Sequence, residues 1–143
     1  MISSEYLNKL NNSQKKAVLH TDGPLLIVAG AGSGKTRVLT SRIAHIIKEK
    51  KAFANQILAV TFTNKAASEM KSRVGSILSK DAIGLPWLGT FHSISAKLLR
   101  KHAKAAGLNS NFSIIDQDDQ IRLIKNICKA ENIDIKKISP NFI

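Results

Sequence analysis

A glycine-rich turn between an apolar run and a helical pattern most constrains what this chain can fold into. The stretch LLIVAGAGSGKTRV, residues 25–38, opens with five apolar residues and continues with three glycines, a lysine and a threonine. The apolar run Leu25 to Ala29 predicts a buried strand, and the residues after the turn recur at helical spacing. Glycine at positions 30, 32 and 34 permits positive φ and a close approach of backbone N–H groups to an anion, at which the helix N-terminus also points. The stretch therefore predicts a phosphate-binding loop.

Two side chains give this loop its expected chemistry. Lys35 would reach the β- and γ-phosphates of a nucleotide, and the hydroxyl of Thr36 would complete a Mg²⁺ shell. An ordinary glycine turn before a helix gives no reason for lysine and threonine at these offsets. The pattern G-x-x-x-x-G-K-[ST] is met except at its first glycine, where the chain has Ala29.

The rest of the chain alternates between apolar runs and helical patterns. A run over residues 57–62 precedes a helical set over residues 67–78, and the segment WLGTF, residues 87–91, is a third candidate strand before another helix. Such alternation predicts an α/β fold with a parallel sheet and helices on both faces.

Helical patterns also flank this alternation at both ends. Two short N-terminal helices are expected, one starting near Ser3 or Ser4 and one near Asn12 or Ser13, all good N-cap residues. A C-terminal amphipathic helix is expected from Ile121 through Ile124 to Cys128, entered through Asp116, Asp118 and Asp119.

The charge of the chain favours a polyanionic partner. Lysine and arginine total 22 and aspartate and glutamate total 10, which gives a net charge of +12. Charge alone fits a nucleic-acid-binding surface and a merely soluble basic surface about equally. No apolar run approaches the roughly 18 residues that a membrane helix needs, so we expect a cytoplasmic protein without a membrane partner. A single cysteine and the spacing of the histidines predict neither a disulfide nor a zinc site.

Three further stretches narrow the choice of ligand. The amide of Gln14, in LNNSQKKAVL, can match the N6 and N7 edge of adenine, or it can be a solvated residue in the first turn of a helix. In AVTFTNKAASEM a strand end carries Phe62, Thr63 and Asn64, which suit stacking on and donating to a nucleic-acid strand. Core packing of the phenylalanine and capping by the two polar residues are the alternatives.

The third stretch, LGTFHSISAKLLRKHAK, has the same arrangement of a strand end followed by a basic helix. Thr90 and His92 are candidates for phosphate contacts, and Phe91 is expected to pack inside.

In order and wording these stretches resemble the superfamily 1 DNA helicases of the UvrD/Rep/PcrA type. The resemblance includes the Q-motif around Gln14, the loop AGAGSGKT, motif Ia as TFTNKAA, motif Ib as GTFH, and FSIIDQDDQIRLIK at the entry to an inserted 1B subdomain. It implies an incomplete P-loop NTPase (RecA-like) 1A domain over residues 1–110 and the start of a helical 1B subdomain over residues 111–143. Ala29 is also the family's usual residue at its position.

The resemblance implies the following site residues. The ATP site would be formed by Gln14, Ala29, Gly30, Ala31, Gly32, Ser33, Gly34, Lys35, Thr36 and Arg37, with Lys35 and Thr36 catalytic and Thr36 serving Mg²⁺. The single-stranded DNA track would include Phe62, Thr63, Asn64, Thr90 and His92.

The function implied is an ATP-dependent helicase that steps 3′ to 5′ on single-stranded DNA and opens duplex at single-strand/double-strand junctions, in repair or replication. The family's Asp-Glu-x-x-Asp motif and second motor domain are absent, and Asp116 in FSIID only imitates a metal-holding carboxylate. We therefore expect this chain to be an N-terminal fragment that binds ATP weakly and unwinds nothing alone. The rival functions are a small P-loop kinase and a non-catalytic nucleic-acid-binding module.

Overall fold

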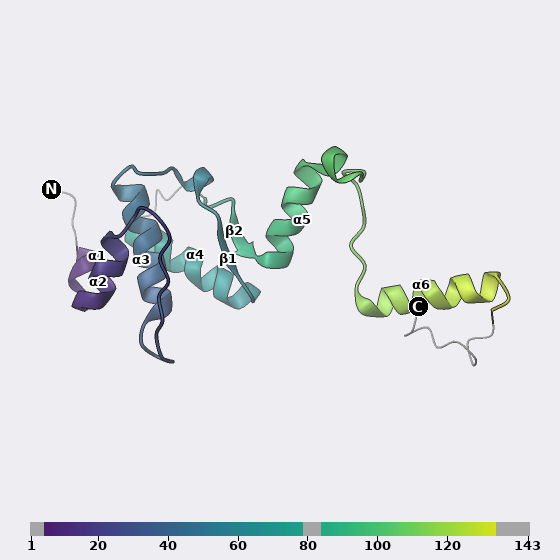
Figure 1. The fold of residues 1–143 in the computed structure, drawn as a ribbon, viewed down its shortest axis with the longest axis horizontal. Helices are drawn as coiled ribbons and strands as arrows, with labels where there is room; N and C mark the ends of the chain where they lie inside the picture. The colour runs from purple at the N-terminus through teal and green to yellow at the C-terminus, as the bar shows by residue number, and fades with distance from the viewer. Residues whose placement is uncertain (1–4, 79–83, 134–143) are drawn as a thin grey trace. The chain divides into compact units, whose positions relative to one another are not determined.

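The computed structural model of the protein describes residues 5–78 and 84–133 (Figure 1). Its elements are, in chain order, α1 (Glu5–Asn8), α2 (Asn12–Leu19), α3 (Lys35–Lys48), η1 (Ala54–Gln56), β1 (Ala59–Thr61), α4 (Asn64–Leu78), β2 (Leu88–Thr90), α5 (Phe91–Lys101), η2 (Ala103–Ala106) and α6 (Gln117–Ala130). The chain forms two compact units, Met1–Leu98 and Leu99–Ile143. The expected caps Ser3 and Ser4 lie outside the described residues. The domain boundary expected near residue 110 stays a prediction.

A small parallel sheet organises the first unit. Strands β1 and β2 pair in register from Ala59 opposite Leu88 to Thr61 opposite Thr90, and α4 is the crossover between them. Parallel strands require such a crossover, usually a helix. The two strands and the helix between them confirm the predicted alternation, although β1 is shorter than the apolar run over residues 57–62.

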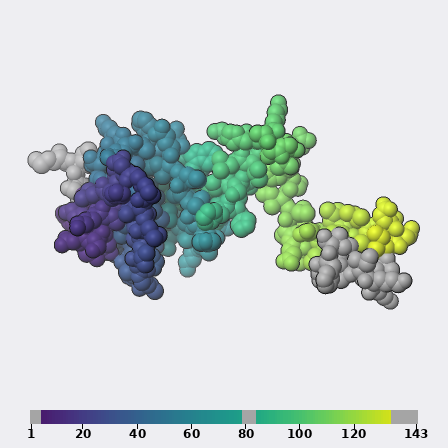
Figure 2. Space-filling model, in the orientation of Figure 1, coloured from purple at the N-terminus to yellow at the C-terminus, as the bar shows by residue number. Residues whose placement is uncertain are grey.

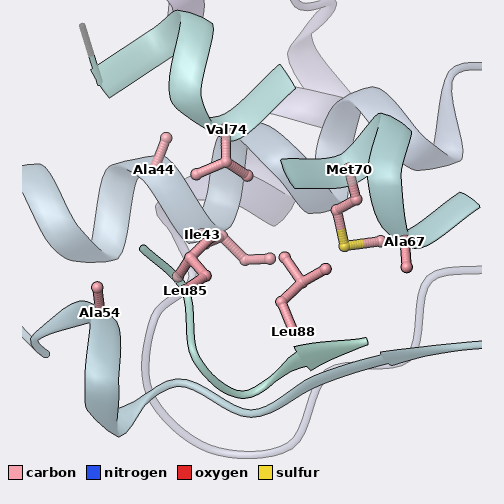
Figure 3. Close-up of a cluster of buried hydrophobic side chains, with 8 residues drawn as sticks. All are labelled: Ile43, Ala44, Ala54, Ala67, Met70, Val74, Leu85 and Leu88. Carbon is pink, nitrogen blue, oxygen red and sulfur yellow. The ribbon is translucent and has the colours of Figure 1, made fainter. Parts of the chain in front are cut away.

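The core of the first unit lies between α3, α4 and the sheet (Figure 3). Ile43 and Ala44 from α3 face Met70 and Val74 from α4, and Leu88 of β2 closes the cluster, all with at most 4% of their surface exposed. The spacing of these residues along α3 and α4 is the helical one that the sequence predicted. The core fixes α3, and with it the loop that precedes α3.

The predicted strand at residues 25–29 is wrong. This segment has no regular secondary structure, and Leu26 and Val28 are 86% and 88% exposed. The two-stranded sheet consists of β1 and β2 alone, so among the described residues the segment has no strand beside it to complete a ladder. An apolar run adopts a buried strand only where neighbouring strands and covering helices exist, and those contacts are remote in sequence.

The helix before this segment begins at Asn12, near the expected position, but its N-cap lies earlier than expected. Asn11 is the N-cap of α2, in place of Asn12 or Ser13. In both Figure 1 and Figure 2 the purple N-terminal helices lie against the blue helix α3. Arg42 of α3 donates to the carbonyl oxygen of Ala17 over 3.2 Å and so ties α2 to α3.

The second unit contains the predicted amphipathic helix. Helix α6 starts where the acidic run predicted, with Asp116 as N-cap accepting from the backbone N–H of Asp119 over 2.8 Å. Cys128 is buried on this helix. Earlier in the unit, the guanidinium of Arg100 lies 5.4 Å from the ring centroid of Phe112. None of the helices in the described residues is both long and apolar enough to cross a bilayer.

Candidate nucleotide-binding site

Two left-handed glycines shape the loop between residue 25 and helix α3. Gly32 has φ 74° and Gly34, the N-cap of α3, has φ 88°. Between them Ser33 turns back on Gly30, with its hydroxyl donating to the Gly30 carbonyl oxygen over 2.7 Å. Positive φ costs a residue with a side chain about 1–2 kcal/mol, so glycine is favoured at both positions. Two of the three loop glycines thus adopt the positive φ that the sequence permits, and Gly30 does not.

The side chain of Lys35 lies over this loop. Its Nζ donates to the carbonyl oxygens of Ala29 and Gly30, each over 2.7 Å, and the group is exposed to solvent. An exposed ammonium within a glycine turn at a helix N-terminus is a fitting partner for a phosphate. The backbone N–H groups of the first turn of α3 add further donors.

Gln14 also reaches the loop. Its Nε2 donates to the Ser33 carbonyl oxygen over 3.0 Å, and its Oε1 accepts from the backbone N–H of Asn11 over 3.0 Å. Asn11 completes a capping box by accepting from the Gln14 backbone N–H over 2.9 Å. One hydrogen and one lone pair of the amide stay available, which is the pair that adenine recognition requires. Sequence reasoning missed Asn11, although the spacing Asn-x-x-Gln is the signature of a capping box.

Thr36 and Arg37 follow on the first turn of α3, and both are exposed. The Thr36 carbonyl oxygen accepts from the hydroxyl of Thr40 over 2.9 Å, which leaves the Thr36 hydroxyl as the group that could touch a metal. Within residues 5–78 and 84–133 no three His, Cys, Asp or Glu side chains gather closely enough to hold a metal ion. A Mg²⁺ here would take its other ligands from phosphate oxygens and water.

The end of β1 presents an aromatic ring to solvent. Phe62 is 89% exposed, and its ring centroid lies 5.4 Å from that of Phe91. Core packing, the alternative for Phe62, is therefore wrong, and the expectation that Phe91 packs inside is also wrong, since Phe91 is 48% exposed. Thr63 does act as a cap, because its hydroxyl accepts from the backbone N–H of Ala66 over 3.1 Å. Asn64 opens α4 with an exposed side chain.

The end of β2 is more enclosed. Thr90 is 7% exposed, and its hydroxyl accepts from the backbone N–H of Ser93 over 3.2 Å at the start of α5. His92, in the first turn of the same helix, is exposed. Of this pair His92 is the group that an external ligand can reach directly.

The lysine-bearing glycine loop, the glutamine bound to it and the polar strand ends belong to a chain whose relatives are named DNA helicases. The chain belongs to the family of the UvrD/REP helicase N-terminal domain, whose model matches residues 10–142. It is 54% identical over 142 residues to the ATP-dependent DNA helicase PcrA of Bacillus subtilis, covering 99% of this chain and 19% of that protein. It is 51% identical over 145 residues to a probable DNA helicase II homolog of Rickettsia conorii, covering 100% of this chain and 22% of that protein. The chain thus spans about a fifth of the length of these curated relatives.

Proposed function

We propose that this chain is the ATP-binding portion of an ATP-dependent DNA helicase that steps 3′ to 5′ on single-stranded DNA and unwinds duplex from single-strand/double-strand junctions. The observation that carries the proposal is the Lys35 ammonium over the glycine loop, with Gln14 bonded to the same loop. The family and the names of the two relatives support the helicase assignment.

Each residue of the loop has a definite part in this proposal. On nucleotide binding Lys35 exchanges its two carbonyl partners for phosphate oxygens, which are charged and so form stronger hydrogen bonds. Thr36 offers its hydroxyl to Mg²⁺, which neutralises phosphate charge when bound. Gln14 uses its remaining hydrogen and lone pair on the adenine edge, and Arg37 lies beside the base.

Single-stranded DNA is the proposed ligand of the strand ends. Phe62 provides an exposed face on which a base stacks, and such stacking tolerates any sequence. Thr63, Asn64 and His92 offer polar groups beside the backbone. Thr90 acts mainly by holding the start of α5.

The chain alone is proposed to bind ATP weakly and not to unwind DNA. Hydrolysis needs a carboxylate to hold the metal and a group to orient water. Asp116 does not supply the first, because its carboxylate caps α6. Multiple-turnover hydrolysis of ATP by this chain would contradict the proposal.

The test is binding of a fluorescent Mg·ATP analogue, competed with ATP and with GTP. We expect saturable binding that ATP displaces better than GTP and that Lys35→Ala abolishes. Lys16→Ala, which removes the same charge from the exposed face of α2, is the matched control and should bind as the unaltered chain does. Binding that survives Lys35→Ala, in a chain with an unchanged thermal melt, would overturn the nucleotide assignment.

A non-catalytic nucleic-acid-binding module is the second candidate. The net charge of +12 and the exposure of Phe62 favour it, since neither requires a nucleotide. It predicts salt-sensitive DNA binding that is indifferent to ATP and to Lys35→Ala. Measured on the same samples, an effect of ATP on oligonucleotide affinity would exclude this candidate.

A further inference from the structure

A cleft lies between helices α1, α3 and α4 of the first unit. Its volume is about 650 Å³, within the range of small-molecule sites. Its lining comes from α1 with the turn that follows it (Glu5, Tyr6 and Lys9), from α3 (Arg37, Thr40, Ser41 and Lys48) and from α4 (Arg73, Ser76 and Ile77). None of residues 29–36 lines it, but Arg37, the residue proposed to lie beside the nucleotide base, does, so the cleft adjoins the candidate nucleotide site without including the glycine loop.

The lining of the cleft is strongly basic. Four of its side chains are cationic, Lys9, Arg37, Lys48 and Arg73, against one carboxylate, Glu5. Arg73 also contacts Glu69 of its own helix, and the Nζ of Lys48 lies 4.8 Å from the ring centroid of Tyr6. Positive charge from α3, from α4 and from the turn after α1 is thus gathered around one concave surface. Such a surface favours a multiply charged anion.

Hydroxyl groups form the polar part of its floor. Thr40 and Ser41 are 1% and 2% exposed, and the Thr40 hydroxyl already donates to the backbone of α3. The Tyr6 hydroxyl is held by His45 over 2.8 Å. Glu5 is the one carboxylate among the lining residues, and Ile77 provides only a small apolar wall.

We propose that this cleft binds the polyphosphate group of a small molecule, at a site distinct from the glycine loop. Lysine ammonium and arginine guanidinium groups are the usual partners of phosphate oxygens. The volume exceeds what a single phosphate fills. Arg73 is paired with Glu69, and the three other lining cations, Lys9, Arg37 and Lys48, match a di- or triphosphate. Because Arg37 and Lys48 project from the helix that begins at Lys35, a bound anion contacts the same element as the nucleotide loop.

The probe is inorganic tripolyphosphate, titrated calorimetrically into the 143-residue chain carrying Lys35→Ala. This background removes the phosphate-binding lysine of the loop, so the result does not depend on the proposed nucleotide site. We expect saturable binding that the double variant Lys9→Gln, Lys48→Gln weakens about tenfold. The matched control is Lys15→Gln, Lys16→Gln on α2, which removes the same charge outside the cleft and should leave the affinity within about twofold.

Two results would overturn the proposal. One is absence of saturable binding in the Lys35→Ala chain. The other is equal weakening by the cleft and control pairs, which would show diffuse attraction to a basic surface. Because Lys48 contacts Tyr6, a thermal melt of each variant checks folding, and Lys9→Gln alone, at an exposed position, should still weaken binding severalfold.

Phosphates of a nucleic-acid backbone carry the same chemistry as a free polyphosphate. Titration with a short oligothymidylate distinguishes the two sources. Oligonucleotide binding that is insensitive to Lys9→Gln, Lys48→Gln supports the small-molecule site. Oligonucleotide binding that needs both lysines and excludes tripolyphosphate would replace it with a nucleic-acid contact.

Discussion

At the scale of single residues, Gly34 joins the two halves of the candidate nucleotide site. It has φ 88°, and an added Cβ would lie 3.0 Å from the Nε2 of Gln14. Gly34→Ala should therefore strain the backbone by about 1–2 kcal/mol and displace the Gln14 amide from the loop. We expect weaker binding of the Mg·ATP analogue and a smaller preference for ATP over GTP, measured by competition.

Gly75 is the control for this substitution. It lies inside α4, and a Cβ there would meet nothing within 4 Å. Gly75→Ala should stabilise the chain by about 0.5–1 kcal/mol and leave nucleotide binding unchanged. If the Gly34→Ala variant bound nucleotide as the unaltered chain does, the hydrogen bond between Gln14 and the loop would not contribute to nucleotide binding.

A substitution at Phe62 distinguishes stacking on DNA from a structural role of this side chain. Its ring is 89% exposed and contacts Phe91. Phe62→Ala should lower oligothymidylate affinity about tenfold, because stacking contributes roughly 1–3 kcal/mol per base, with little change in melting temperature. Phe53→Ala, at another exposed phenylalanine with 70% of its surface accessible, should leave affinity unchanged. Equal losses in both variants would argue against a specific stacking position.

At the scale of elements, Tyr6 fastens α1 to α3. With His45 in its Nε2–H tautomer, the Tyr6 hydroxyl donates to His45 Nδ1 over 2.8 Å. Burial, and after it the charge of Glu49, raises the pKa of Tyr6 above its usual value. The folded state then holds this proton more tightly than the unfolded state. Its stabilising effect is complete below the unfolded pKa of about 10 and is lost as pH rises through the folded pKa.

Tyr6→Phe tests this fastening. Loss of the hydrogen bond should lower the free energy of unfolding by about 1 kcal/mol near neutral pH, measured by urea titration. The variant should also lack the part of the alkaline decline that Tyr6 causes. Tyr6 is the only tyrosine of the chain, so tyrosinate absorbance reports its titration directly. An unshifted titration together with an unchanged alkaline decline would contradict the assignment.

Local periodicity predicted the elements whose partners are near in sequence. Helices α3 and α4 followed from apolar spacing, and α6 also from the acidic residues at its start. Local periodicity could not decide whether residues 25–29 form a strand, because a strand depends on hydrogen-bonding partners that are remote in sequence. The exposure of Phe91 was missed for a related reason, since an aromatic residue after a strand packs inside only if something covers it.

The same distinction between near and remote partners decides which candidate sites could be predicted from the sequence. The glycine loop and Gln14 could be read from spacing, because phosphate binding needs particular residues at fixed offsets. The basic cleft could not, since Lys9 follows α1, Lys48 lies on α3 and Arg73 lies on α4, and they come together only when these helices pack. No short pattern in the sequence marks that meeting.

At the scale of the whole molecule, the exposed apolar segment before the glycine loop governs solution behaviour. Leu26 and Val28 are almost fully exposed, and Leu25 and Ile27 are 39% and 36% exposed. Apolar surface on an extended, unpaired segment drives association, since each Å² removed from water contributes about 25 cal/mol. We expect the chain to self-associate at micromolar concentrations and to bind a dye specific for apolar surface.

Lysine at both positions should reverse this behaviour. The double substitution Leu26→Lys, Val28→Lys adds charge to the exposed segment and changes no residue of the core. The free energy of unfolding should therefore change by no more than about 0.5 kcal/mol. Sedimentation velocity should then show a monomer where the unaltered chain associates. Leu58→Lys, at a leucine outside this segment that is 61% exposed, is the control and should associate as the unaltered chain does. If the double variant associated equally, the driving surface would lie elsewhere, and the exposed face of α6, with Leu123 and Ile127 each 51% exposed, would be the next to alter.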